Sequence, residues 1–108
     1  FLRGTIKGWL YNAADPSFAP ELVVNGPGRD LGLEINQQKI QNKIQMEYMQ
    51  SALTEKKGIF WIDPQDVEQN MYPSLRATGR TNLPPAAEIF DTRALQAAYK
   101  EITLPLTL

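Results

Sequence analysis

The stretch from Phe1 to Pro16 constrains the fold most, because it combines a helical spacing of apolar side chains with a firm stop. Its apolar residues recur at steps of three or four: Leu2, Ile6, Trp9, Leu10 and Ala13. This spacing predicts a helix with one apolar face. The helix should end at Asp15, since the residue before a proline is pushed out of the helical region. No capping residue precedes Phe1, so we expect a segment of a longer protein.

Further periodic segments predict about five helices in all, and hence a mainly α-helical array in one unit, residues 1–108. The second helix is short, covers 20–24 with Leu22, Val23 and Val24 on its buried side, and stops at Asn25-Gly26-Pro27-Gly28. We interpret that glycine-containing stop as a surface turn, because it lacks the spacing of a phosphate-binding loop. The fourth helix begins at Asp63-Pro64, and the fifth follows Asp91 with a stripe of Leu95, Ala98, Tyr99 and Ile102.

The third helix is the longest and is predicted over 35–53, with Asn36 as its cap. Its apolar stripe consists of Ile40, Ile44, Tyr48 and Ala52, widened by Met49 and Leu53. We expect Met49 in the core, Met46 at its edge and the glutamines on the other side. Residues 54–58 should form a charged break after this helix.

Three features leave the local structure open. The apolar run 59–62 fits either a buried strand or a packed approach to the next helix. Val67, Met71 and Leu75 predict one face of the fourth helix, but Pro73 should bend or split it. The last six residues, 103–108, alternate like a short edge strand or form an extended tail.

Composition excludes several classes of function. The 108 residues carry a net charge of -1, whereas a nucleic-acid-binding domain needs a basic face. No apolar run approaches the roughly 20 residues of a membrane span. The chain has no cysteine and no histidine, which removes thiol chemistry and the commonest general base and metal ligand. We therefore expect no enzyme activity, metal or cofactor within this segment.

Few side chains suggest a ligand site. Asp63 and Asp66 suit helix capping better than catalysis. Arg3 and Arg80 are expected to face solvent or to form salt bridges. Trp61 has two interpretations: its indole either contacts a ligand at a cleft or anchors the following helix in the core.

The segments also resemble a known family in their order. Phe1 to Tyr11, Pro20 to Val24, the long helix from Ile35, Trp61 and Phe90-Asp91-Thr92 are similar to the second half of certain ABC-transporter solute-binding proteins. These proteins bind nitrate, sulfonates, taurine and thiamine-pyrimidine precursors. The resemblance implies a fragment of a two-lobed α/β periplasmic binding protein, in which the helices scaffold one wall of the solute cleft.

The resemblance further implies a periplasmic or extracytoplasmic parent protein that delivers a small anionic or heteroaromatic solute to an ABC permease. Trp61 is then the candidate ligand-binding residue. An apolar face separated from its sheet should also make the fragment self-associate. Two alternatives stay open: a fragment of a thiamine-pyrimidine biosynthesis enzyme of the same fold, and a free-standing helical interaction module.

Overall fold

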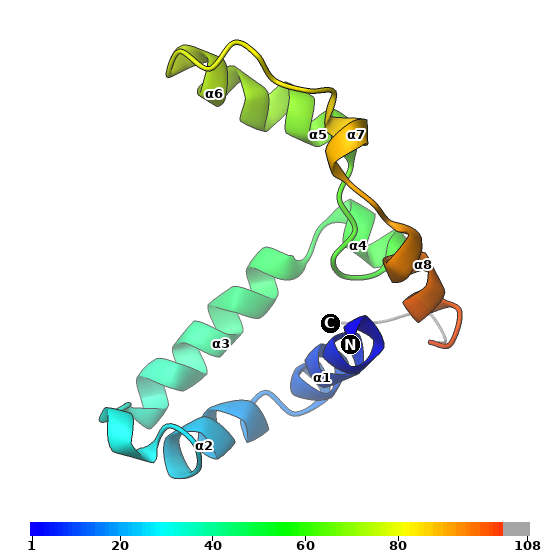
Figure 1. Ribbon diagram of the computed structural model, residues 1–108. Coiled ribbons are helices and arrows are strands. Elements are labelled where there is room, and N and C mark those ends of the chain that lie inside the picture. The colour runs from blue at the N-terminus through cyan, green and yellow to red at the C-terminus, as the bar shows by residue number, and fades with distance from the viewer. Residues whose placement is uncertain (103–108) are drawn as a thin grey trace.

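The computed structural model describes residues 1–102, and within that range the chain is mainly α-helical with no strand (Figure 1). The predicted fold class, a mainly α array, is confirmed. In chain order the elements are α1 (Leu2–Ala14), α2 (Phe18–Asn25), a 3₁₀ turn (Arg29–Leu31), α3 (Ile35–Met49), α4 (Ala52–Lys57), α5 (Pro64–Asp66), a π-helical turn (Val67–Met71), α6 (Tyr72–Ala77), α7 (Ala86–Ile89) and α8 (Arg93–Tyr99). The strand or tail predicted at 103–108 lies outside the described residues.

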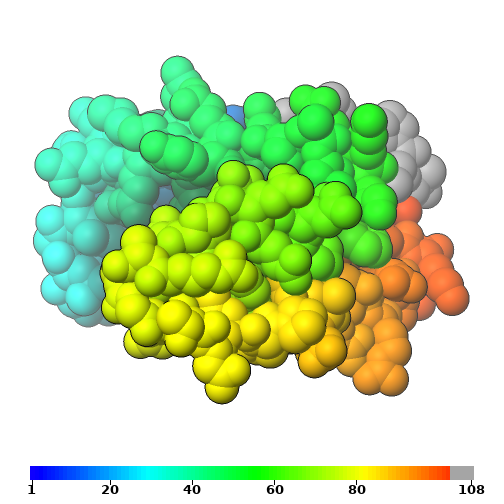
Figure 2. All heavy atoms as spheres, turned by 90° about the horizontal axis from the view of Figure 1, so that it is seen from above, coloured from blue at the N-terminus to red at the C-terminus, as the bar shows by residue number. Residues whose placement is uncertain are grey.

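The helices form an open array. α2 packs against α3 and α1 against α8, while α5, the π-helical turn and α6 lead away from this group (Figure 1). The radius of gyration is 17.2 Å, against about 13 Å for a compact chain of this length. Seen from above, α6 and the connector after it form the near surface, with α2 and the start of α3 at one end (Figure 2). Such a shape leaves helix faces without cover.

The first core cluster joins the beginning and end of the described chain. Ile6 of α1, Ile59 and Leu95 of α8 are its buried residues. Half-buried side chains complete it: Leu2, Trp9, Leu10, Met49, Trp61, Ala98, Tyr99 and Ile102. The predicted stripes of the first and last helices are thus confirmed as the two sides of this cluster, and Met49 joins it as expected.

A second cluster surrounds the π-helical turn. Its buried residues are Val67, Tyr72 and Ala86. The predicted face through Val67, Met71 and Leu75 was wrong at Met71, which is 60% exposed. The backbone N–H of Tyr72 bonds to the carbonyl of Val67, five residues back, so the buried residue after Val67 comes one position later. Pro73, which has no N–H to donate, follows this turn. The predicted disruption of the helix near Pro73 is therefore confirmed, in the form of a π-helical turn.

The long helix predicted over 35–53 is divided. α3 ends at Met49, and α4 covers most of the segment expected to be a break. Ser51 and Thr54 form a capping box, in which each side chain accepts from the other residue's backbone N–H, so a new helix starts there. The cap of α3 is Glu34, not Asn36: its carboxylate accepts the N–H of Asn36 at 2.9 Å.

The apolar stripe predicted to bury α3 points away from its neighbours. Ile40, Ile44 and Tyr48 are 60%, 45% and 87% exposed. The side of α3 that meets α1 and α2 instead carries polar residues: Asn42 bonds to Asn12 of α1, and Lys39 pairs with Glu21 of α2. The predicted buried side of the second helix was also wrong: Leu22 is 53% exposed.

No helix within residues 1–102 combines the length and the apolar character needed to cross a membrane. This agrees with the expectation drawn from the sequence.

Candidate ligand site at Trp61

Trp61 lies in the turn between α4 and α5, and the path of this turn is fixed by Tyr99. The run 59–62 is neither strand nor helix, which leaves the interpretation as a packed approach to the next helix. Gly58 has φ +99° and Phe60 has φ +69°. The Tyr99 ring occupies the space where a side chain at position 58 would lie. Its hydroxyl donates to the carbonyl oxygen of Ile59 at 2.9 Å. The turn therefore depends on a side chain of α8, distant in the sequence.

The indole of Trp61 contacts the apolar core and also a cation. It is half-buried and packs against the first core cluster. The Nζ of Lys57 lies over the ring, 5.0 Å from its centroid, where the face of an aromatic ring attracts a cation. The indole Nε1 is buried, and within residues 1–102 no acceptor satisfies it. A buried donor without a partner costs about 1–3 kcal/mol; because the accessible area of this atom is below 1 Å², a molecule in the solvent cannot reach it in this conformation.

A cavity of about 340 Å³ lies beside Trp61. Its walls come from both core clusters, since Trp61 belongs to the first and Phe90 to the second. The lining residues are Leu53, Lys57, Trp61, Ile62, Asp63, Pro64, Ala87, Phe90 and Thr92. The volume is at the lower end of the range of roughly 300–1,000 Å³ seen for small-molecule pockets. Aromatic and aliphatic walls with one cation and one carboxylate suit a small, flat, polar molecule.

Asp63 has a structural role at the rim of this cavity. Its Oδ1 accepts the backbone N–H of Gln65 at 2.9 Å and so caps α5. The predicted capping role is confirmed for Asp63. Asp66 lies in the first turn of the same helix. Because Asp63 is already engaged by the backbone, Lys57 is the charged side chain more free to meet a ligand.

The other charged side chains considered in the sequence lie at the surface. Arg3 forms an ion pair with Glu101, so the salt bridge that was one of the two roles expected for Arg3 is confirmed. Arg80 is exposed on the connector after α6. Asp91 and Arg93 pair at the start of α8, and the Arg93 guanidinium lowers the pKa of the Asp91 carboxyl. The Asp91 Oδ1 also accepts the backbone N–H of Arg93 at 3.0 Å, but the N-cap of α8 is Thr92, so a prediction of Asp91 as the N-cap is wrong by one residue.

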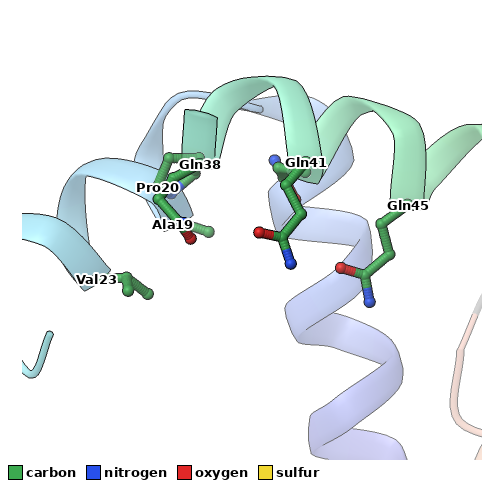
Figure 3. Close-up of a pocket in the computed structure, with 7 residues that line it drawn as sticks. Ala19, Pro20, Val23, Gln38, Gln41 and Gln45 are labelled. Carbon is green, nitrogen blue, oxygen red and sulfur yellow. The ribbon is translucent and has the colours of Figure 1, made fainter. Parts of the chain in front are cut away.

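A smaller hollow of about 110 Å³ lies between α2 and α3 (Figure 3). Amide side chains of α3, including those of Gln41 and Gln45, project toward the space beside α2. The remaining lining residues are Ala19, Pro20, Val23, Gln38 and Asn42. At this size the hollow is smaller than a typical small-molecule pocket, so we consider the cavity at Trp61 the better candidate.

One buried polar contact near this hollow could not be predicted from the sequence. Asn12 of α1 is 7% exposed and pairs with Asn42 of α3 through both side-chain amides. The sequence shows that Asn12 lies on the same helix as the apolar stripe of residues 1–14, but it does not indicate which residue the Asn12 amide contacts.

Within residues 1–102 no three acidic side chains converge to hold a metal ion. Comparison of the chain with protein-family models, with curated proteins and with solved structures found no match.

Proposed function

We propose that this chain forms part of one wall of a two-lobed, extracytoplasmic solute-binding protein of an ABC importer, and that Trp61 contacts the solute. The resemblance in the order of its segments motivates the proposal. The observation that carries it is the cavity of about 340 Å³ that Trp61 and Lys57 line together.

The chemistry of the cavity favours a small anionic or heteroaromatic solute. A flat ring can lie along the walls formed by Trp61 and Phe90. A sulfonate, carboxylate or nitrate group can pair with Lys57, which already lies against the same indole.

The open arrangement of helices also supports a wall within a larger body. The exposed apolar side chains of α2 and the large radius of gyration fit a layer that is covered by further structure. In the proposed protein, that further structure is the rest of two lobes that close over the solute in a hinge motion driven by its differential affinity for the closed state.

Fluorescence of Trp61 tests the proposed site directly. The chain has two tryptophans, so Trp9→Phe leaves Trp61 as the only indole reporter. Titration of this variant with nitrate, taurine and an aminopyrimidine should give a saturable change in emission for at least one of them. Lys57→Gln should weaken anion binding, whereas Lys56→Gln, its exposed neighbour, should leave it unchanged. No saturable response to any of the three, or equal effects of the two lysine variants, would contradict the proposal.

The gene sequence that surrounds this segment tests the proposed location and partner. An export signal upstream would support an extracytoplasmic protein that serves an ABC permease. A cysteine cluster without an export signal would instead favour the alternative of a pyrimidine-forming enzyme of thiamine biosynthesis.

A further inference from the structure

α3 is apolar on two opposite sides. Residues advance by about 100° around a helix, so Ile40, Ile44 and Tyr48 form one stripe, while Met46 and Met49 lie on the opposite side. The side with Met49 packs into the first core cluster. The stripe is uncovered, with exposures of 60%, 45% and 87%. A helix with apolar side chains on both sides is typical of a helix buried from both sides.

The uncovered stripe contains a hollow and no charge. A shallow depression of about 590 Å³ is lined only by Gln37, Ile40, Gln41, Ile44, Gln45 and Tyr48. The two borders of the stripe differ. Glutamines form one border, and the Lys43–Glu47 pair, whose charged atoms are 4.0 Å apart, forms the other. When a second copy of α3 runs in the opposite direction, each border can pair with the same border of that copy: glutamines with glutamines, and Lys43 with Glu47.

From this symmetry we infer that α3 binds α3 of a second copy, antiparallel, about a twofold axis at Ile44. Ile44 then meets its own counterpart, and Ile40 packs against Tyr48 of the second copy. Lys43 comes within about 3 Å along the axis of Glu47 of the second copy, since each residue advances by about 1.5 Å. The glutamine borders face each other and exchange amide hydrogen bonds. A parallel pair would instead place the Lys43–Glu47 border of each copy opposite the glutamine border of the other, so no ion pair would form between the copies.

The proposed contact is smaller than a typical stable interface. A stable interface buries about 1,600 Å² in total, and one pair of 15-residue helices falls short of that area. The dimer should therefore be weak and depend on concentration. Its formation involves neither Trp61 nor Lys57, so it stands independently of the proposed solute site.

Disulfide trapping tests the axis. The chain has no cysteine, so Ile44→Cys introduces the only thiol. Under mild oxidation this variant should form a covalent dimer in high yield, because residues on a twofold axis face their own copies. Ala97→Cys, at an exposed position of α8, is the matched control and should stay mostly monomeric.

Charge reversal tests the antiparallel direction. Lys43→Glu and Glu47→Lys should each weaken the dimer at least tenfold in sedimentation equilibrium, because each places like charges together across the axis. The double variant K43E/E47K should restore the affinity of the unchanged protein. Circular dichroism of each variant should show unchanged helix content, which separates association from folding.

Two results would overturn the inference. One is a monomer at all concentrations, with the Ile44→Cys thiol no more readily oxidised than that of Ala97→Cys; the stripe would then be covered by another part of a longer chain. The other is a dimer whose affinity responds to neither charge reversal nor Ile44→Gln, which would place the interface elsewhere.

Discussion

Asn12 of α1 and Asn42 of α3 bind each other through both side-chain amides. The Asn12 Nδ2 donates to the Asn42 Oδ1 at 2.8 Å, and the Asn42 Nδ2 donates to the Asn12 Oδ1 at 3.0 Å. The Asn42 amide also donates to the carbonyl oxygen of Pro16 at 3.0 Å. One pair of amides thus fixes the long helix to the first helix and to the turn that follows it.

Loss of this pair should be costly. We expect Asn12→Ala to lower the free energy of unfolding by about 1–3 kcal/mol, because it leaves part of the Asn42 amide without a partner. Urea unfolding of Asn12→Ala, Asn42→Ala and the double variant measures the coupling between them. Asn70→Ala, at an exposed position, is the control. Additive effects of the two single changes would contradict the pair's importance.

The capping box of α4 should contribute measurably to stability. Ser51→Ala should cost about 1 kcal/mol, since the Ser51 hydroxyl satisfies the Thr54 backbone N–H. Ser17→Ala provides a matched control, because Ser17 precedes α2 without a capping hydrogen bond from its side chain. Chemical unfolding of the two variants should differ by most of that amount. Equal losses would show that the box is not needed to start α4.

The turn before Trp61 should accept only glycine at position 58. Gly58→Ala combines a φ of +99° with a Cβ placed 2.3 Å from Cζ of Tyr99, so we expect a loss of about 2 kcal/mol or more. Gly79→Ala has a similar φ of +89° but open space around the Cβ. It should cost about 1 kcal/mol. Thermal or urea unfolding separates the two, and the difference between them measures the clash with Tyr99.

Tyr99 should make the stability depend on pH in alkaline solution. Burial raises its pKa above the ordinary value. A raised pKa in the folded state means that the folded chain holds the proton more tightly, so this contribution is complete below the pKa of an unfolded tyrosine, about 10. It is lost as the pH rises through the higher folded pKa. Tyr99→Phe should therefore show a shallower decline in urea stability between neutral pH and about pH 11.

The control for this effect is Tyr11→Phe, which changes a tyrosine that is 56% exposed and lies outside the proposed dimer contact. It should follow the unchanged protein over the same pH range. A decline equally steep in Tyr99→Phe would mean that other groups account for the alkaline loss of stability.

Local chemistry allowed much of the fold to be predicted. The first and last helices, their stripes, the cap at Asp63 and the disruption near Pro73 all depend on residues within a few positions of one another. The candidate site was predicted only as a single residue. Trp61 was recognised, but the cavity beside it needs Phe90 and Thr92, which the chain brings there from about thirty residues away.

Apolar spacing by itself does not predict burial in this chain. The stripe of α3 fits an amphipathic helix, yet Ile40, Ile44 and Tyr48 face outward, and amides make the inner contact. At Met71 a π-helical turn shifted the period from four residues to five, which no local pattern indicates. The division at Ser51 was missed because its capping box lies inside a continuous helical pattern.

The sequence alone determined the helix ends that a proline or a capping aspartate marks, such as the end of α1 and the start of α5, since these residues act over a single turn or two. Only the tertiary structure decided which helix faces are covered, how the turn at Gly58 is held by Tyr99, and which residues line the cavity at Trp61. The physical reason is that burial and hydrogen bonding between distant segments depend on how the helices are placed, and that placement is not encoded in any short stretch of chain.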